Sequence, residues 1–207
     1  MTESAFRIPI AKLAWKGVSG REVASKILET QRFAELDQYR ATTHNKGIMN
    51  GIDSVILATG NDWRAIEAGA HAWATRDGRY SSLTNWEIDS FKCLVGSIEI
   101  PMAVGLVGGA TATHPTSKSC INLLGVRSSS EFGQVLAAVG LAQNLGALRA
   151  LATEGIQRGH MTLHAKNIAV AVGAVGLEVD SVSKRMIDEK NISLDRAASL
   201  LVKKNLY

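Results

Sequence analysis

The stretch GIMNGIDSVILA, residues 47–58, decides the fold. Large apolar residues fall on nearly every side of the helix that this stretch would form. They are Ile48, Met49, Ile52, Val55, Ile56 and Leu57. A helix that is apolar almost all round is typical of the buried centre of a domain. The sequence therefore predicts a central helix here, with the other elements packed around it.

The segments before and after this helix predict further helices and one strand. Residues 4–12 alternate apolar and polar side chains, which favours a short strand, and Pro9 suggests a sheet edge. A capping box at residues 19–22 begins a helix that runs to Leu36. Residues 37–46 have no clear period and are expected to form a loop or the entrance to a helix. Residues 62–75 are again helical.

The second half of the chain predicts a small sheet followed by helices. Residues 84–100 resemble two strands joined near Gly96, and a glycine-rich turn extends to Gly109. Helices are expected over residues 115–124, 130–153 and 160–172, and two short ones begin at about Leu177 and at Ser193. The fold class is therefore α+β: helix-rich, with a small sheet around a buried central helix.

Composition limits the classes of protein to which the chain can belong. It has 207 residues, of which 46% are hydrophobic and 20% charged, as expected for one domain or one domain with a small appendage. The net charge of +4 is small and its basic residues are scattered, which argues against nucleic acid but suits an anionic ligand. No membrane span or signal peptide is apparent, so we expect a cytoplasmic protein.

The two cysteines, Cys93 and Cys120, form no CxxC pair and have no clustered partners. Two buried, reduced thiols are favoured over a disulfide or a metal site.

Lys46, Asn50 and Asp62 form the first candidate group for chemistry. Lys46 and Asn50 are four residues apart, so on a helix they share a face. Asp62 follows the central helix, and its carboxylate could return toward Lys46. Such a pair could stabilise a developing oxyanion, although spacing alone favours an ordinary surface salt bridge.

His160 and His164 are also four residues apart, which is the spacing of a two-histidine metal site. The residues between them include no glutamate and no third ligand is obvious, so no metal is expected. His160 lies at a helix start, where it suits proton transfer near neutral pH, and His164 is expected to be structural.

The glycine-rich turn at residues 105–111 matches neither GxGxxG nor the Walker pattern. A tight backbone turn is the favoured interpretation, and the sequence contains no dinucleotide fingerprint.

Three of these segments together resemble the class II, bacterial and archaeal type of 3-hydroxy-3-methylglutaryl-CoA (HMG-CoA) reductase. Residues 39–53, YRATTHNKGIMNGID, are similar to the lysine motif of that family. Residues 58–71, ATGNDWRAIEAGAH, resemble its aspartate motif, and residues 154–161, EGIQRGHM, its histidine motif. The turn at 105–111 is also similar to a family stretch, and the resemblance extends from about Phe6 to the end.

The resemblance implies a role for each matching residue. Lys46 would stabilise the oxyanion formed when hydride adds to the thioester, and Asp62 would hydrogen-bond that lysine. His160 would protonate the departing CoA thiolate from a mobile flap. The expected substrate contacts are Arg40, Asn50 and, as a weaker candidate, Gln143.

The resemblance also implies domains and partners. Residues 1–155 would belong to a substrate-binding, dimerising large domain and residues 156–207 to a helical carboxy-terminal flap. The catalytic glutamate and the domain that binds NAD or NADP come earlier in complete enzymes, and we expect this chain to lack both. Expected partners are HMG-CoA, mevalonate, coenzyme A, a second copy in a homodimer or higher oligomer, and a missing upstream half.

Two functions follow from these expectations. The first is NAD(P)-dependent reduction of HMG-CoA to mevalonate, or its reverse, with the isolated chain inactive. The alternative is a non-catalytic fragment that binds acyl-CoA or dimerises.

Overall fold

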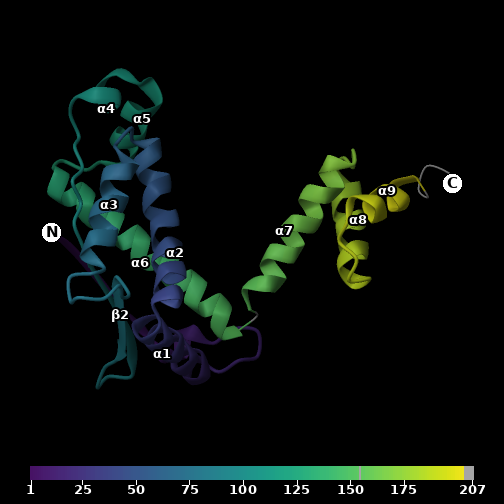
Figure 1. Cartoon of the computed structure of the whole chain (residues 1–207), viewed down its shortest axis with the longest axis horizontal. Coiled ribbons are helices and arrows are strands. Elements are labelled where there is room, and N and C mark those ends of the chain that lie inside the picture. Colours follow the sequence, from purple (N-terminus) through teal and green to yellow (C-terminus); the bar gives the residue numbers. More distant parts are fainter. Residues whose placement is uncertain (154, 203–207) are drawn as a thin grey trace. The chain divides into compact units, whose positions relative to one another are not determined.

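The computed structural model describes residues 1–153 and 155–202, and within them all side chains except those of residues 112, 156–160 and 202. The chain divides into two compact units, Met1–Thr153 and Glu154–Tyr207 (Figure 1). Each unit has its own hydrophobic core.

The sheet of the first unit is antiparallel, with the strand order β1-β3-β2. Its strands are β1 (Thr2–Pro9), β2 (Thr84–Ile88) and β3 (Cys93–Ile100). Gly96 lies in the middle of β3, opposite Phe6 on one side and Trp86 on the other. The two rings meet edge to face, with centroids 5.5 Å apart. A Cβ atom on Gly96 would lie 2.5 Å from the Trp86 ring, so only glycine fits between them.

The turn between β2 and β3 lies at residues 89–92, so the prediction that the strands join near Gly96 is wrong. The Asp89 carboxylate accepts hydrogen bonds from the backbone N–H groups of Phe91 and Cys93, both at 2.9 Å. Lys92 has a φ of 58°, in the left-handed region. An Asx turn of this kind supplies a reversal without glycine, which explains why the sequence pattern pointed to the wrong residue.

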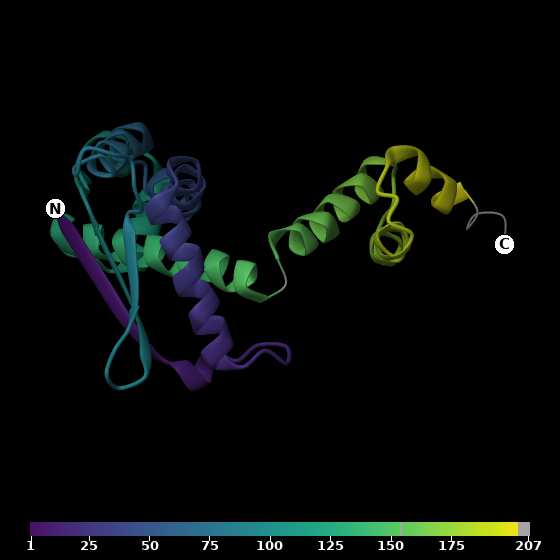
Figure 2. The same ribbon diagram turned by 60° about the horizontal axis from the view of Figure 1, so that its bottom comes forward.

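Helices cover the sheet in two layers. Helices α1 (Gly20–Leu36) and α6 (Ser129–Thr153) contact the strands, and α2 (Gln38–Ala58) packs on both of them. Figures 1 and 2 show α6 running beneath α2 and past the strands. The remaining elements are a 3-10 helix η1 (Ile10–Leu13), α3 (Trp63–Trp73), α4 (Gly109–Thr113) and α5 (Pro115–Leu124).

Helix α2 begins nine residues earlier than its apolar stretch does. Asp37 caps it, because its carboxylate accepts a 2.7 Å hydrogen bond from the backbone N–H of Arg40. Residues 38–46 are therefore helical. The expected burial on all sides is wrong, because Lys46, Asn50 and Leu57 are exposed. One face of α2 packs into the core and the other is open.

Helix α6 is long and apolar enough to cross a membrane by composition, with a mean hydropathy of 1.4 over its best 18-residue window. Phe132, Leu136, Leu141 and Leu148 are nevertheless fully buried in the core of the first unit. Burial of this kind is what a core helix requires.

The second unit contains α7 (Ile156–Ala171), α8 (Leu177–Asp188) and α9 (Leu194–Val202). Its core is made of small and medium side chains, among them Ala165, Ala169 and Met186. Ion pairs between Lys166 and Asp180, at 2.7 Å, and between Arg196 and Glu189, at 2.6 Å, join its helices. The predicted helices over residues 160–172 and from Leu177 and Ser193 are confirmed, the first with an earlier start.

Candidate active site

Helix α2 carries three of the predicted site residues: Arg40, Lys46 and Asn50. Lys46 and Asn50 lie one turn apart, and both are exposed, which confirms that they share a face. Arg40 begins the same helix and is partly buried, and this burial lowers the pKa of its guanidinium. All three side chains therefore project from one rigid element.

His44, one turn after Arg40, fixes this helix to the rest of the unit. It is only 3% exposed, and its Nε2 atom lies 2.8 Å from the Thr84 hydroxyl and 3.1 Å from the Asn144 amide nitrogen. Asn144 in turn accepts a 2.9 Å hydrogen bond from the Trp86 indole. This network joins α2, β2 and α6. It fixes the orientation of α2 about its own axis.

His44 is neutral in this setting. Burial, reinforced by the nearby charge of Arg40, lowers the pKa of its imidazole to about 3. The sequence analysis did not single out His44. The feature that could have identified His44 is its position among the apolar residues of α2, because a buried polar side chain requires hydrogen-bond partners.

Gln143 lies close to the Asn50 end of this face. A Cβ atom on Gly51 would lie 2.8 Å from the Cβ atom of Gln143, so α6 and α2 are in close contact there. Gln143 itself is exposed. The packing thus brings Gln143 beside the residue that follows Asn50.

Asp62 is the N-cap of α3. Its Oδ1 atom accepts hydrogen bonds from the backbone N–H groups of Arg64, at 3.0 Å, and Ala65, at 3.4 Å. These bonds, the Ala65 one foremost, hold the pKa of the exposed Asp62 carboxyl below its usual value, and Arg64 pairs with it at 3.4 Å. An open hollow of about 360 Å³, lined by residues 60–64, surrounds this carboxylate.

The glycine-rich segment at residues 105–111 supports the turn that carries Asp62. The Asn61 side-chain oxygen accepts a 2.9 Å hydrogen bond from the Gly105 N–H, and the Thr111 hydroxyl donates to the Thr59 carbonyl at 3.0 Å. Gly60 has a φ of 71°, and its position leaves no room for a larger side chain beside Ser117. The segment leads into α4, which has five residues.

Lys46 lies near the middle of α2 and Asp62 lies beyond its carboxy-terminal end. Twelve residues separate Lys46 from Ala58, the last residue of the helix, which corresponds to about 18 Å along its axis. The Asp62 carboxylate accepts its backbone hydrogen bonds from the first turn of α3. No ion pair joins this carboxylate to Lys46 among the described residues, so their pairing stays a prediction.

The acid on which the charge of Lys46 acts within the chain is Asp53. Burial and a hydrogen bond with Glu67 raise the pKa of the Asp53 carboxyl to about 7, and the charge of Lys46 opposes this shift. The Oδ1 atom of Asp53 is buried without a hydrogen-bond partner among the described residues. The sequence analysis missed this residue, although Asp53 follows Lys46 by seven residues and so lies on the same helical face.

His160 belongs to α7, and its side chain lies outside the described residues. His164, one turn later, is exposed. Among the described residues, no group of three or more His, Cys, Asp or Glu side chains is placed to bind a metal. Cys93 and Cys120 are free thiols, and they are partly exposed, contrary to the expected full burial.

Comparison with known proteins gives a consistent result. A family model described as hydroxymethylglutaryl-coenzyme A reductase matches residues 2–165. The chain is 52% identical over 200 residues to 3-hydroxy-3-methylglutaryl-coenzyme A reductase of Archaeoglobus fulgidus, covering 96% of this chain and 46% of that protein. A probable reductase of the same name from Borreliella burgdorferi is 46% identical over 146 residues, 70% of this chain and 34% of that protein.

A solved structure extends the similarity to the fold. It is a class II 3-hydroxy-3-methylglutaryl-CoA reductase from Streptococcus pneumoniae bound to NADPH in open conformations. The match has a TM-score of 0.71 and 46% sequence identity, and it covers 98% of this chain and 49% of that chain. The chain thus spans about half the length of the Archaeoglobus and Streptococcus proteins.

Proposed function

Because this chain belongs to the hydroxymethylglutaryl-coenzyme A reductase family, we propose that it supplies the lysine, the aspartate and the histidine of a site that reduces HMG-CoA to mevalonate and coenzyme A, or catalyses the reverse. The observation that carries the proposal is the open face of α2. It presents the Lys46 cation beside Asn50 on a helix held in place by the buried His44 network.

In this proposal Lys46 stabilises the oxyanion that forms as the thioester carbonyl is reduced. Pre-positioned charge at such an oxygen is worth about 3–4 kcal/mol in comparable enzymes. The anchoring of α2 supports this role, because a fixed helix costs little reorganisation when charge develops. Arg40, Asn50 and Gln143 would orient the hydroxymethylglutaryl group, and their placement on or beside α2 supports that assignment.

His160 would protonate the departing CoA thiolate. A free thiol has a pKa of about 8.5, so a thiolate near neutral pH would attack the new carbonyl again unless a nearby acid traps it. A histidine is suited to that transfer. The support for this role is the match of residues 154–161 to the family's histidine motif.

The proposed cofactor is NADH or NADPH, which supplies the hydride when bound. The glycine-rich segment serves the Asp62 turn, and the helix that follows it, α4, is too short to bind a diphosphate. We therefore assign hydride delivery to no residue of this chain.

A second copy of the chain would complete the site. Lys46 lies near the middle of α2 and Asp62 lies beyond its carboxy-terminal end, and a two-fold axis crossing that helix between them would bring Lys46 of each copy toward Asp62 of the other. On the same face of α2, Tyr39 is 87% exposed and Leu57 is 59% exposed. Exposed apolar side chains along a functional face are typical of an interface between subunits.

The decisive experiment combines this chain with the cofactor-binding half of a class II reductase and follows NADPH absorbance with HMG-CoA. Turnover that Lys46→Ala abolishes and Lys12→Ala leaves intact is the expected result. If the two parts form a complex but give no turnover, the reductase proposal is wrong.

Subunit mixing tests the shared site separately. Lys46→Ala and Asp62→Ala assemblies should each be inactive. Random mixing should restore about one quarter of the wild-type rate, because half of the dimers then hold one intact site of two. No recovery after verified exchange of subunits would place both residues in a site of one chain.

The alternative is a non-catalytic fragment that binds acyl-CoA or dimerises. The half-length match to the family favours it for the chain on its own. It predicts binding of HMG-CoA or self-association without turnover in the mixed assembly. We further propose a cytoplasmic location, which cell fractionation would test.

A further inference from the structure

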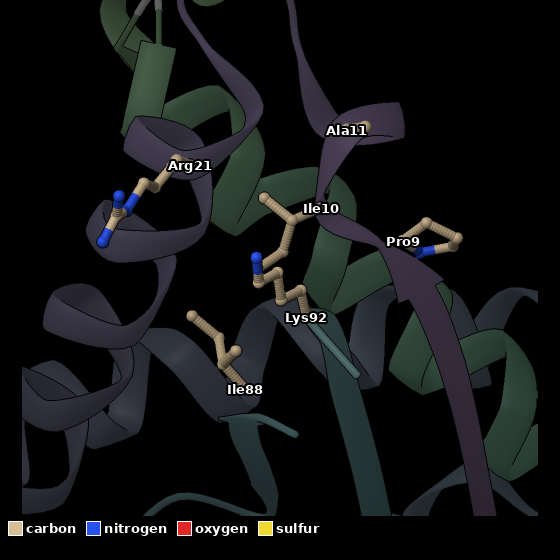
Figure 3. A pocket seen from close by; sticks show the side chains of 6 residues that line it. All are labelled: Pro9, Ile10, Ala11, Arg21, Ile88 and Lys92. Atoms are coloured by element: carbon tan, nitrogen blue, oxygen red, sulfur yellow. The ribbon is translucent and has the colours of Figure 1, made fainter. Parts of the chain in front are cut away.

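An apolar pocket lies at the end of the sheet, between η1, α1 and the β2–β3 turn. Its volume is about 640 Å³, within the range of pockets that hold small molecules. Pro9, Ile10, Ala11, Arg21, Ile88 and Lys92 line it (Figure 3). In Figure 3, Ile10, Ile88 and Lys92 converge from three separate elements, and Arg21 lies across from them on α1.

The walls of this pocket are held by backbone contacts. Gly20, the first residue of α1, is so close to η1 that a Cβ atom there would overlap the Ile10 carbonyl. The Ile10 N–H donates a 3.2 Å hydrogen bond to the Lys92 carbonyl. Lys92 itself is held in the left-handed region by the Asp89 turn, a conformation that is uncommon outside glycine and typical of constrained sites.

The charges at the pocket are positive and uncompensated. Neither Arg21 nor Lys92 has an ion-pair partner within the part of the chain that the structure describes. The adjacent acid, Glu22, is engaged by Lys26 at 2.8 Å. The amino-terminal end of the 17-residue helix α1 adds its positive dipole on the same side. Ile88, in the wall between the two cations, is 42% exposed.

We propose that this pocket binds an amphipathic anion, a short apolar chain that ends in a carboxylate or a phosphate. The chain would lie against Ile10 and Ile88, and Arg21 and Lys92 would pair with the head group. This site uses none of the residues assigned to the reductase chemistry, so the proposal stands apart from that function.

Titration of the ¹⁵N-labelled 207-residue chain with decanoate, decyl phosphate and the neutral decanol tests the proposal. Backbone amide shifts should centre on Ile10, Ile88 and Lys92, and one of the two anions should bind more tightly than decanol. Arg21→Gln and Lys92→Gln should each weaken anion binding about three- to tenfold and leave decanol binding unchanged. Ile88→Ala should weaken binding of all three ligands.

Arg32→Gln is the matched control, because it removes a cation from the same helix about three turns away from Arg21 and should change nothing. Equal binding of decanol and both anions would overturn the proposal. Anion affinities that the Arg21 and Lys92 substitutions leave unchanged would also overturn it. Anion binding that weakens as the chain concentration rises would identify a second copy as the occupant and overturn it as well.

Discussion

The carboxyl groups of Asp53 in α2 and Glu67 in α3 share a hydrogen bond, which one proton must occupy. Two carboxylates this close resist joint ionisation, and burial adds to the effect. The result is a carboxyl group with a pKa of about 7 on the same helical face as the Lys46 cation.

Asp53 should make the chain less stable as the pH rises. Folding raises the pKa of Asp53 from 3.8 to about 7, so the folded chain binds more protons than the unfolded chain between those values, and stability falls across that window. The loss should be about 1 kcal/mol once solvent screening is allowed for. Urea unfolding of the chain and of Asp53→Asn between pH 4 and 8 measures it. An equal slope in both proteins would contradict the assignment.

His44 should act in the opposite direction. Folding lowers its pKa from 6.5 to about 3, so the unfolded chain binds more protons in that interval and stability falls as the pH drops through it. The contribution is about 5 kcal/mol. His44→Ala should flatten this acid limb and also destabilise the chain at pH 7, because it removes the partner of the Asn144 amide nitrogen and one partner of the Thr84 hydroxyl. His71→Ala, at a partly buried position, is the comparison variant, and the acid limb should persist in it.

The two roles of Asp62 can be separated by substitution. Asp62→Ala should cost about 1 kcal/mol of stability, because it removes the N-cap of α3. Asp62→Asn keeps a capping oxygen and should leave the stability within a few tenths of a kcal/mol. In the mixed assembly both variants should lose turnover, because both lack the charge. Full activity of Asp62→Asn would limit Asp62 to its capping role.

The centre of the sheet should not tolerate a side chain at Gly96. Gly96→Ala places a Cβ atom against Trp86 and should destabilise the chain by about 1–3 kcal/mol in urea unfolding. Gly146→Ala in α6 meets no atom within 4 Å and should stabilise it by about 0.5–1 kcal/mol. If Gly96→Ala also raised the free energy of unfolding, the space around Gly96 would be larger than described.

The open face of α2 should govern self-association. Leu57→Glu introduces a charge among exposed residues of this face and should shift the chain toward monomer in sedimentation velocity. Leu123→Glu in α5, where the side chain is 89% exposed, should leave the distribution unchanged. If Leu57→Glu dimerised as the wild-type chain does, the carboxy-terminal end of α2 would not be part of the interface.

Local patterns in the sequence predicted most of the elements. The helices over residues 19–36 and 115–124 and the long helix to Thr153 could be found because caps, proline and periodic apolar residues specify them within a few positions. The β2–β3 turn could not be found from glycine, since Asp89 builds it through hydrogen bonds to residues that follow.

The sequence predicted which residues belong to the candidate site, but not how these residues are placed relative to one another. Lys46, Asn50 and Asp62 stand in motifs that the sequence displays, but the distance between Lys46 and Asp62 depends on how far α2 continues. The early start of α2 depends on the Asp37 cap, and its rotation depends on His44 meeting Thr84 and Asn144, one hundred residues away in the last case. Such pairings are long-range and leave no period in the sequence.

The separation of Lys46 and Asp62 by the second half of α2 also limits how this protein can evolve. One residue inserted between Lys46 and Ala58 would turn the lysine by about 100° relative to the aspartate, and four residues would restore the face but displace it by about 6 Å. Neither change could be repaired at a single position. For the proposed site, in which Lys46 and Asp62 act together, we therefore expect substitutions along this segment to be tolerated better than insertions or deletions.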